Sequence, residues 1–302
     1  MDVGRLLTAM ITPFTDDNHV DLAGIARIVD HLIETGTTAI VACGTTGESP
    51  TLSHDEKLEV IKETVQATAG RVPVIAGTGS YDTRESILLS QEAQSLGADG
   101  LLLVSPYYNR PTQEGLEAHF TAIANAVDIP IMLYNVPGRT GVRIEIPTIL
   151  RLAQLPNVFA VKEASGDMAH IVRLCANKPD DLAVFSGDDS FTLPVLSVGG
   201  SGVVSVAAHV VGPEMTAMMD AYFAGRLMEA AEWNGRLVPI YDALFQISSP
   251  IPVKGALGLL GLPAGSPRLP LHAAPAPVLE RLRKELERLG KFDSTLLETA
   301  HA

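Results

Sequence analysis

Eight short apolar runs recur along the first two thirds of the chain, and their spacing limits the possible folds more than any other feature. They occupy residues 6–11, 38–42, 73–77, 100–104, 130–134, 158–162, 183–186 and 202–206. Strands that are apolar throughout, rather than alternating, are typical of a parallel sheet covered on both faces. The runs therefore predict parallel strands separated by helices.

The segments between these runs have the apolar periodicity of amphipathic helices, most clearly at residues 21–34, 53–68, 83–96 and 112–127. Ser53 to Glu56 has the pattern of a capping box at the start of one of them. Eight strand–helix units within about 210 residues favour an α/β fold of the (β/α)8 TIM-barrel type. An open doubly wound sheet is the alternative, but the chain has no G-x-G-x-x-G loop of the kind such sheets often carry.

Further helical periodicity follows the last run, at residues 213–224, 227–246, 252–260 and 277–289. We expect the first of these helices to complete the barrel and the others to form a C-terminal helical extension. The predicted division is a catalytic barrel at 1–225 and the extension at 226–302. A Pro-rich loop is expected at 263–277, and the residues after Lys291 are expected to be loosely held.

Composition narrows the class of protein. The 302 residues are 46% hydrophobic and 19% charged, with a formal net charge of −13, so a large core is expected and basic surfaces for nucleic acid or anionic membranes are not. No apolar run approaches the ~20 residues of a transmembrane helix, and the N-terminus lacks the build of a signal peptide. Two cysteines are too few for a disulfide scaffold. These features predict a soluble cytoplasmic protein.

The sixth run ends on Lys162. An amine at the end of a buried strand is poorly solvated, so its pKa tends to fall, and a neutral amine attacks carbonyl groups to form a Schiff base. The alternative is a lysine whose amine reaches solvent or pairs with Glu163.

Catalytic groups of barrels gather where strands end, so the other strand ends are expected to lie near Lys162 and to supply further groups of the site. They contribute hydroxyls and glycines at 44–48, paired tyrosines at 107–108, a phenol at Tyr134 and a guanidinium at Arg139. Together these groups suit imine chemistry on a 2-oxo acid without metal or cofactor. Some of these groups have a plainer interpretation: residues 44–48 as an ordinary glycine-rich turn, and the tyrosines as interface packing. The seventh run is followed by two acids at 188–189, which are more simply a helix cap than a metal site. His54 is expected to be a surface residue and His209 a core or surface residue, with a place in the site as its alternative.

Three motifs, read in order, carry a family resemblance: Gly44–Glu48, Tyr134–Gly141 and Val161–Ala164. With them the chain resembles the class I pyruvate-dependent aldolases of the N-acetylneuraminate lyase superfamily, and within it the dihydrodipicolinate synthase family. The similarity runs from about Gly4 to about Leu271 and includes the segments at 186–189 and 250–254.

The resemblance implies a condensation of pyruvate with L-aspartate 4-semialdehyde in the diaminopimelate route to lysine. Lys162 would form the Schiff base, and Tyr134 would transfer protons with Thr45 and with Tyr108 from a neighbouring subunit. Thr45 and Thr46 would bind the pyruvate carboxylate, and Arg139 the carboxylate of the semialdehyde. Backbone at Gly187 and Val204 would line the lysine pocket. A Tyr108 that acts across an interface further implies a homo-oligomer, expected to be a tetramer built as a dimer of dimers.

Two alternatives remain open at this point. The first is a sister lyase, either N-acetylneuraminate lyase or a 2-keto-3-deoxy sugar-acid aldolase, which shares the barrel, the lysine and the tyrosine but generally lacks the arginine found here as Arg139. The second is a non-catalytic barrel that binds small carboxylates as a regulator, since fold alone does not fix function.

Some relatives are inhibited by lysine bound at a subunit interface. The corresponding positions here are Ser49, His54, Lys57, Tyr81, Glu85 and Tyr107. Inhibited relatives tend to carry histidine in place of Lys57 and asparagine in place of Tyr81. A cation at Lys57 would repel a lysine ligand, so we expect weak or absent feedback inhibition.

Overall fold

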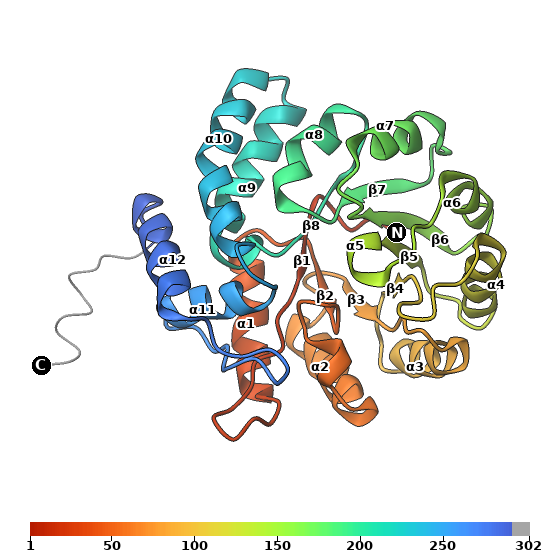
Figure 1. Ribbon diagram of the computed structural model, residues 1–302, viewed down its shortest axis with the longest axis horizontal. Helices are drawn as coiled ribbons and strands as arrows, with labels where there is room; N and C mark the ends of the chain where they lie inside the picture. Colours follow the sequence, from red (N-terminus) through yellow and green to blue (C-terminus); the bar gives the residue numbers. More distant parts are fainter. Residues whose placement is uncertain (292–302) are drawn as a thin grey trace, which may run out of the picture.

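Eight parallel strands close into a barrel in the computed structural model, which describes residues 1–291 (Figure 1). The barrel is closed by pairing of the first strand with the last, and neighbours in the sequence are neighbours in the barrel. The predicted TIM barrel is confirmed, and the open-sheet alternative is wrong. The strands are β1 (Leu6–Ala9), β2 (Ala39–Ala42), β3 (Val74–Gly77), β4 (Gly100–Val104), β5 (Ile131–Asn135), β6 (Val158–Glu163), β7 (Ala183–Ser186) and β8 (Gly202–Ser205).

Helices surround the barrel because each strand is followed by an amphipathic segment (Figure 1). The Asp21 carboxylate caps the first helix, and both halves of the predicted capping box at Ser53 are formed. The helices of the barrel are α1 (Leu22–Glu34), α2 (His54–Thr68), α3 (Thr83–Ser95), α4 (Gln113–Ala124), α5 (Pro137–Thr140), α6 (Ile146–Leu152), α7 (Met168–Asn177), α8 (Thr192–Ser197) and α9 (Ala208–Phe223), with 3-10 turns η1 (Ser49–Thr51) and η2 (Asp189–Phe191).

Helix α9 begins five residues before the start predicted at Pro213, which is a correction. The sequence pattern favoured Pro213 as the first helical residue, because proline has no N–H to donate within a helix. The structure accommodates it inside the helix through a kink, since the backbone at Val211 departs from helical geometry (φ −132°, ψ 30°).

Two apolar layers form the core. One fills the barrel with inward-facing side chains such as Met132, Ala160 and Phe185, and the other lies between strands and helices. Because successive side chains of a strand point to opposite faces, Lys162 shares the inward face of β6 with Ala160. The register therefore directs the lysine amine into the barrel.

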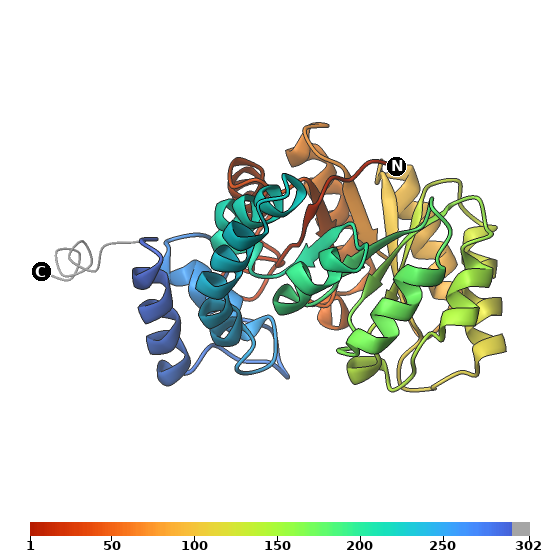
Figure 2. The same ribbon diagram turned by 90° about the horizontal axis from the view of Figure 1, so that it is seen from above.

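After α9 the chain turns at Gly225 (φ +77°) and forms three more helices: α10 (Leu227–Leu244), α11 (Ile251–Leu259) and α12 (Ala276–Arg288). In Figures 1 and 2 these helices gather on one side of the barrel, with α10 beside α9. The predicted Pro-rich loop falls between α11 and α12. The division at 225/226 stays an interpretation, and the expectation for the chain after Lys291 lies outside the described residues.

Within residues 1–291, no helix is both long enough and apolar enough to cross a lipid bilayer.

Candidate active site

A cavity of about 190 Å³ opens where the strands end, as expected for a barrel. Two of the predicted motifs meet in it, since it is lined by Thr45 from the 44–48 turn and by Tyr134 and Arg139 from the 134–141 segment. Its lining is completed by Cys43, Gly44, Ser49, Pro50, Gly77, Gly79, Leu102, Val104, Tyr107, Val136 and Thr140.

Lys162 lies beside this cavity on β6, with 5% of its surface exposed. It is the register partner of Tyr134 on β5, and its Nζ is 4.4 Å from the centre of the Tyr134 ring. Burial lowers the pKa of the Lys162 amine to about 8, with the charge of Asp189 acting to raise it and that of Arg139 to lower it further. About a tenth of the amine is therefore neutral and nucleophilic at pH 7, far more than for a lysine of ordinary pKa.

The alternative pairing of Lys162 with Glu163 is excluded by the contacts of Glu163. Successive strand residues point to opposite faces, and the Glu163 carboxylate accepts hydrogen bonds from the Asn135 side chain at 2.8 Å and the Ser165 N–H at 2.8 Å. His170 lies 3.6 Å from the same carboxylate. Glu163 therefore holds the outer side of β6 and leaves the lysine amine to the barrel interior.

The Tyr134 phenol is buried at the end of β5. Burial raises its pKa, while the charge of Arg139 and the hydroxyl of Thr45 oppose that rise. The phenol therefore stays protonated at neutral pH and retains a proton that it can donate and recover.

Arg139 lies in α5, a single turn of helix that follows β5 directly. It lines the cavity, and its charge acts on both Lys162 and Tyr134. A guanidinium at this place supplies donors for a carboxylate of a ligand in the cavity.

Gly187 follows β7 at a point where no side chain fits. A Cβ there would lie 2.7 Å from the Ala164 Cβ and 3.0 Å from the Lys162 Cε. The glycine thus lets the backbone after β7 approach the Lys162 side chain closely. Val204 is buried in the barrel interior on β8, and Thr46 is buried in the 44–48 turn without lining the cavity at the strand ends.

The Asp189 carboxylate has contacts that the sequence did not reveal. Only Asp188 caps the following turn, where its side chain accepts from the Ser190 N–H. The Asp189 carboxylate is instead buried and accepts hydrogen bonds from the Ser205 hydroxyl and from the N–H groups of Val206 and Ala207. Burial raises its pKa to about 6. The only sequence signal for this contact was the pair of acids after a strand, and such a pair fits helix capping equally well.

The paired tyrosines take different places. Tyr107 lines the cavity and packs edge-on against Tyr81, with ring centres 5.2 Å apart. Tyr108 is 93% exposed and has a left-handed backbone (φ 72°), which is uncommon for a residue other than glycine. Its side chain does not line the cavity.

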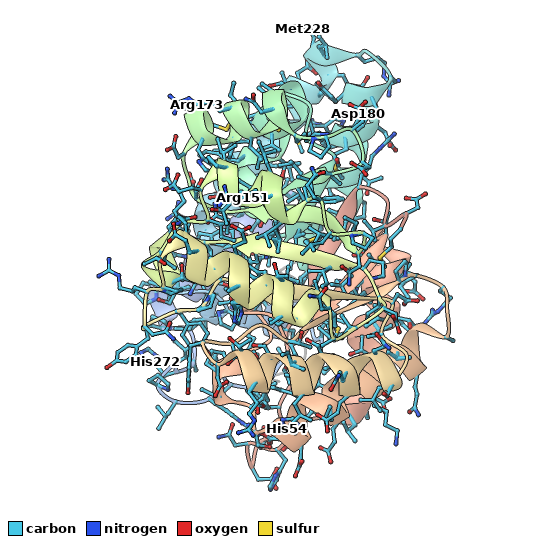
Figure 3. All side chains as sticks on the ribbon, turned by 90° about the vertical axis from the view of Figure 1, so that its right-hand side faces the viewer. His54, Arg151, Arg173, Asp180, Met228 and His272 are labelled. Carbon is cyan, nitrogen blue, oxygen red and sulfur yellow. The ribbon has the colours of Figure 1, made fainter. Side chains whose placement is uncertain are left out.

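The two histidines considered from the sequence lie outside the cavity. His54 is partly exposed near the edge of the molecule (Figure 3), where it bridges Glu85 at 2.9 Å and Glu92 at 2.8 Å, and these carboxylates raise its pKa. His209 is fully buried; its Nε2 accepts from the Ile11 N–H and its Nδ1 donates to the Val206 carbonyl. Burial lowers the His209 pKa to about 4, so it is a neutral core residue.

The positions compared with a lysine-binding site lie on the α2 and α3 side of the molecule. Ser49 and Tyr107 line the cavity mouth, whereas Tyr81 and His54 lie beyond it. Lys57 lies on α2, and its backbone carbonyl accepts a hydrogen bond from the Cys43 thiol. Among residues 1–291, no group of three His, Cys, Asp or Glu side chains is arranged to hold a metal ion.

Comparison with known proteins gives the same family as the motifs. The chain matches the model of the dihydrodipicolinate synthetase family over residues 2–289. It is 51% identical to 4-hydroxy-tetrahydrodipicolinate synthase from Moorella thermoacetica over 290 residues, which are 96% of this chain and 99% of that one.

Solved structures agree with this match. The dihydrodipicolinate synthase of Cyanidioschyzon merolae with lysine bound has a TM-score of 0.94 and 44% identity, covering 96% of this chain and 99% of that one. The chloride-inhibited enzyme of Acinetobacter baumannii complexed with pyruvate has a TM-score of 0.93 and 42% identity, with the same coverage. The chain therefore belongs to the dihydrodipicolinate synthetase family.

Proposed function

We propose that this enzyme is a 4-hydroxy-tetrahydrodipicolinate synthase, which condenses pyruvate with L-aspartate 4-semialdehyde in lysine biosynthesis. The observation that carries the proposal is the buried Lys162 amine, with its pKa lowered to about 8, at the carboxyl end of β6 beside Tyr134. Membership of the family and the activity of relatives about half identical to the chain support it.

The reaction begins on Lys162. Its neutral Nζ attacks the keto carbon of pyruvate, and loss of water leaves a protonated imine that draws electrons from the adjacent carbon. The methyl group then loses a proton to give an enamine, whose carbon attacks the aldehyde carbon of the semialdehyde. The amino group of that second substrate attacks the imine carbon, closes the ring and returns the free amine of Lys162.

Proton transfers in this sequence need a group that gives and takes a proton beside the amine. Tyr134 fits that role because its buried phenol stays protonated and lies next to Lys162. Thr45 would pass protons to and from it and would bind the pyruvate carboxylate together with Thr46. Gly187 and Val204 would shape the pocket around the imine.

The second substrate carries a carboxylate, and Arg139 would bind it. Arg139 lines the cavity from the turn of helix after β5, within electrostatic reach of Lys162. This arginine also separates the proposal from a sister lyase acting on N-acetylneuraminate or on 2-keto-3-deoxy sugar acids, whose substrates require hydroxyl-binding groups there. A non-catalytic carboxylate-binding barrel would have no use for an amine with a lowered pKa.

A complete site would require a second subunit. Tyr108 projects outward from its own protomer with a left-handed backbone, as expected of a side chain that inserts into a neighbour. The assembly we propose is a homotetramer built as a dimer of dimers, in which Tyr108 of one subunit completes the proton relay of the next. The free thiols of Cys43 and Cys175 agree with a cytoplasmic location.

The proposed substrates are tested by turnover. Purified enzyme is given pyruvate and aspartate semialdehyde, and the cyclic product is measured beside cleavage of N-acetylneuraminate and of a 2-keto-3-deoxy sugar acid. Product from the first pair alone is expected. Cleavage of a sugar acid without condensation would move the enzyme to the sister lyases, and neither reaction would favour the non-catalytic alternative.

A further inference from the structure

A buried ion pair joins the C-terminal extension to the 44–48 turn. Glu48 ends that turn, and its Oε1 is 2.6 Å from the Nζ of Lys254 on α11. Its Oε2 accepts a hydrogen bond from the Arg268 N–H at 2.8 Å. The side chains of Glu48 and Lys254 are 2% and 1% exposed, so this contact is shielded from solvent.

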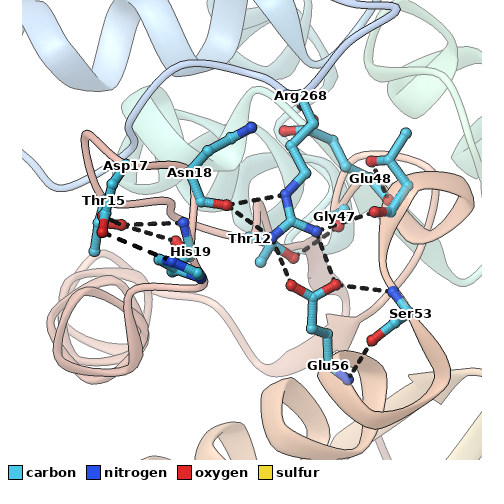
Figure 4. A network of polar contacts seen from close by, with 11 residues as sticks. Thr12, Thr15, Asp17, Asn18, His19, Gly47, Glu48, Ser53, Glu56 and Arg268 are labelled. Atoms are coloured by element: carbon cyan, nitrogen blue, oxygen red, sulfur yellow. Dashed lines mark hydrogen bonds and ion pairs between the residues drawn. The ribbon is translucent and has the colours of Figure 1, made fainter.

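Arg268, also in the extension, binds the other end of residues 48–56, as Figure 4 shows. Its guanidinium donates to the Thr51 carbonyl at 3.0 Å and to the Glu56 carboxylate at 2.8 Å. Phe14 packs beneath both cations, with its ring centre 4.1 Å from the Lys254 Nζ and 4.4 Å from the Arg268 Cζ. The extension therefore holds residues 48–56 at two points.

The turn itself needs such anchors. Glu48 has a left-handed backbone (φ 58°), which residues other than glycine adopt only when their surroundings enforce it. Its N–H donates to the Thr45 carbonyl at 3.1 Å, and the Ser49 N–H donates to the Gly44 carbonyl at 3.3 Å. The position of the Glu48 carboxylate is thus linked through a few backbone bonds to the Thr45 hydroxyl in the cavity.

Stability alone does not require this pair. Apolar side chains of similar size often stabilise a buried site as well as an ion pair does, because the charges lose their hydration. A charged contact does specify one geometry, since a shift of the turn would separate two buried opposite charges. Burial lowers the pKa of Lys254 to about 8 and the adjacent Glu48 acts to raise it, in keeping with a pair that stays charged at neutral pH.

We propose that Glu48 and Lys254 are positioning residues for the reaction. Their contact sets the 44–48 turn so that the hydroxyls of Thr45 and Thr46 meet the carboxylate of the first substrate. Neither residue lines the cavity that holds Thr45, Tyr134 and Arg139, so both act through the turn rather than on the substrate. The inference rests on the proposed function, because it assigns the turn its task in that reaction.

Three variants of the full-length enzyme test this: Glu48→Gln, Lys254→Met and the double variant. The measurements are kcat and KM for pyruvate, the melting temperature, and borohydride trapping of Lys162 at saturating pyruvate. Misplacement of a substrate-binding group by about 1 Å lowers rates up to about 100-fold. We expect each single variant to lower kcat/KM for pyruvate about 10- to 100-fold, while trapping at saturating pyruvate persists.

The double variant distinguishes positioning from folding. It leaves no unpaired buried charge, so it is expected to fold even where a single variant does not. If the pair positions the turn, the double variant is as impaired as the single ones and not more, because all three lose the same contact. A double variant with wild-type kcat and KM would overturn the proposal.

Lys291→Met is the matched control. It removes a similar cation of the C-terminal region, 2.6 Å from Glu214 on α9, that does not contact the turn. It is expected to leave kcat and KM unchanged, and an equal loss there would show a general effect of the extension and overturn the specific role of Glu48 and Lys254. Failure of the wild-type enzyme to turn over pyruvate and aspartate semialdehyde would instead refute the proposed function.

Discussion

Lys162 and Tyr134 are register partners on adjacent strands, and the lysine Nζ lies 4.4 Å from the centre of the tyrosine ring. The ring therefore covers the amine on one side, and the phenol lies at the cavity one residue before the end of β5. A cation over an aromatic face is stabilised, so the same contact would favour the positive imine that we propose forms on Lys162. One pair of strands thus carries both the proposed nucleophile and its proposed proton donor.

The pH dependence of imine formation follows from burial of Lys162. Its pKa is lowered to about 8, so the neutral fraction grows about tenfold between about pH 6 and pH 7 and levels off above about pH 8. Asp189→Asn removes a negative charge that acts to raise this pKa, and the midpoint should move to lower pH. Stopped-flow rates of imine formation with pyruvate measure it, with Asp188→Asn as the control expected to leave the midpoint in place. A midpoint that stays put or rises in Asp189→Asn would contradict this assignment.

Arg139→Ala is expected to separate the two substrates. Loss of a charged hydrogen bond to the semialdehyde should lower kcat/KM for that substrate about 10- to 100-fold. Imine formation with pyruvate should change far less. Arg143→Ala, which removes a nearby guanidinium paired with Asp167 at 3.0 Å, is the matched control and should leave both steps intact. Equal losses of both steps in Arg139→Ala would show that the arginine is structural.

Mixed oligomers test whether Tyr108 acts in a neighbouring subunit. Tyr108→Phe and Lys162→Ala are each expected to be nearly inactive. Co-assembled subunits should regain activity, because a site with native Lys162 then receives native Tyr108 from its neighbour. Turnover of co-expressed variants with distinct affinity tags measures this. No recovery in a verified hybrid, or an active monomer by sedimentation, would contradict the shared site.

Inhibition by L-lysine is expected to be weak or absent. Lys57 places a cation and Tyr81 a bulky ring among the positions that bind lysine in inhibited relatives, and Tyr81 is held by its contact with Tyr107. Turnover should therefore be nearly unaffected at sub-millimolar lysine. The variant Lys57→His/Tyr81→Asn should become more sensitive. Half-maximal inhibition of the wild-type enzyme in that range would refute the expectation.

Much of the fold could be predicted because barrel strands carry strong local signals. All eight apolar runs became strands, and the extension helices lie within two residues of their expected bounds at each end. The local pattern gave the wrong start for α9, because a kink before Pro213 lets the helix begin earlier. It also gave no bounds for the short helices α5 to α8. The local sequence favours Pro213 as the start of a helix, whereas the kink at Val211 accommodates it inside α9.

The placement of Lys162, Tyr134 and Arg139 was predictable because each lies at or just after a strand end, and their roles stay predictions. Contacts between residues far apart in the chain were not predictable. The Asp189 carboxylate finds its donors on the β8 side of the barrel, and Glu48 meets Lys254 from the distant extension. Neither pairing follows from any spacing in the sequence.

Borohydride reduction in the presence of pyruvate, followed by intact-mass measurement and peptide mapping, tests whether Lys162 forms the Schiff base. We expect one pyruvate adduct per chain, located on Lys162 and abolished in Lys162→Ala. An enzyme that turns over both substrates without any adduct, or with the adduct on another lysine such as Lys254, would contradict it.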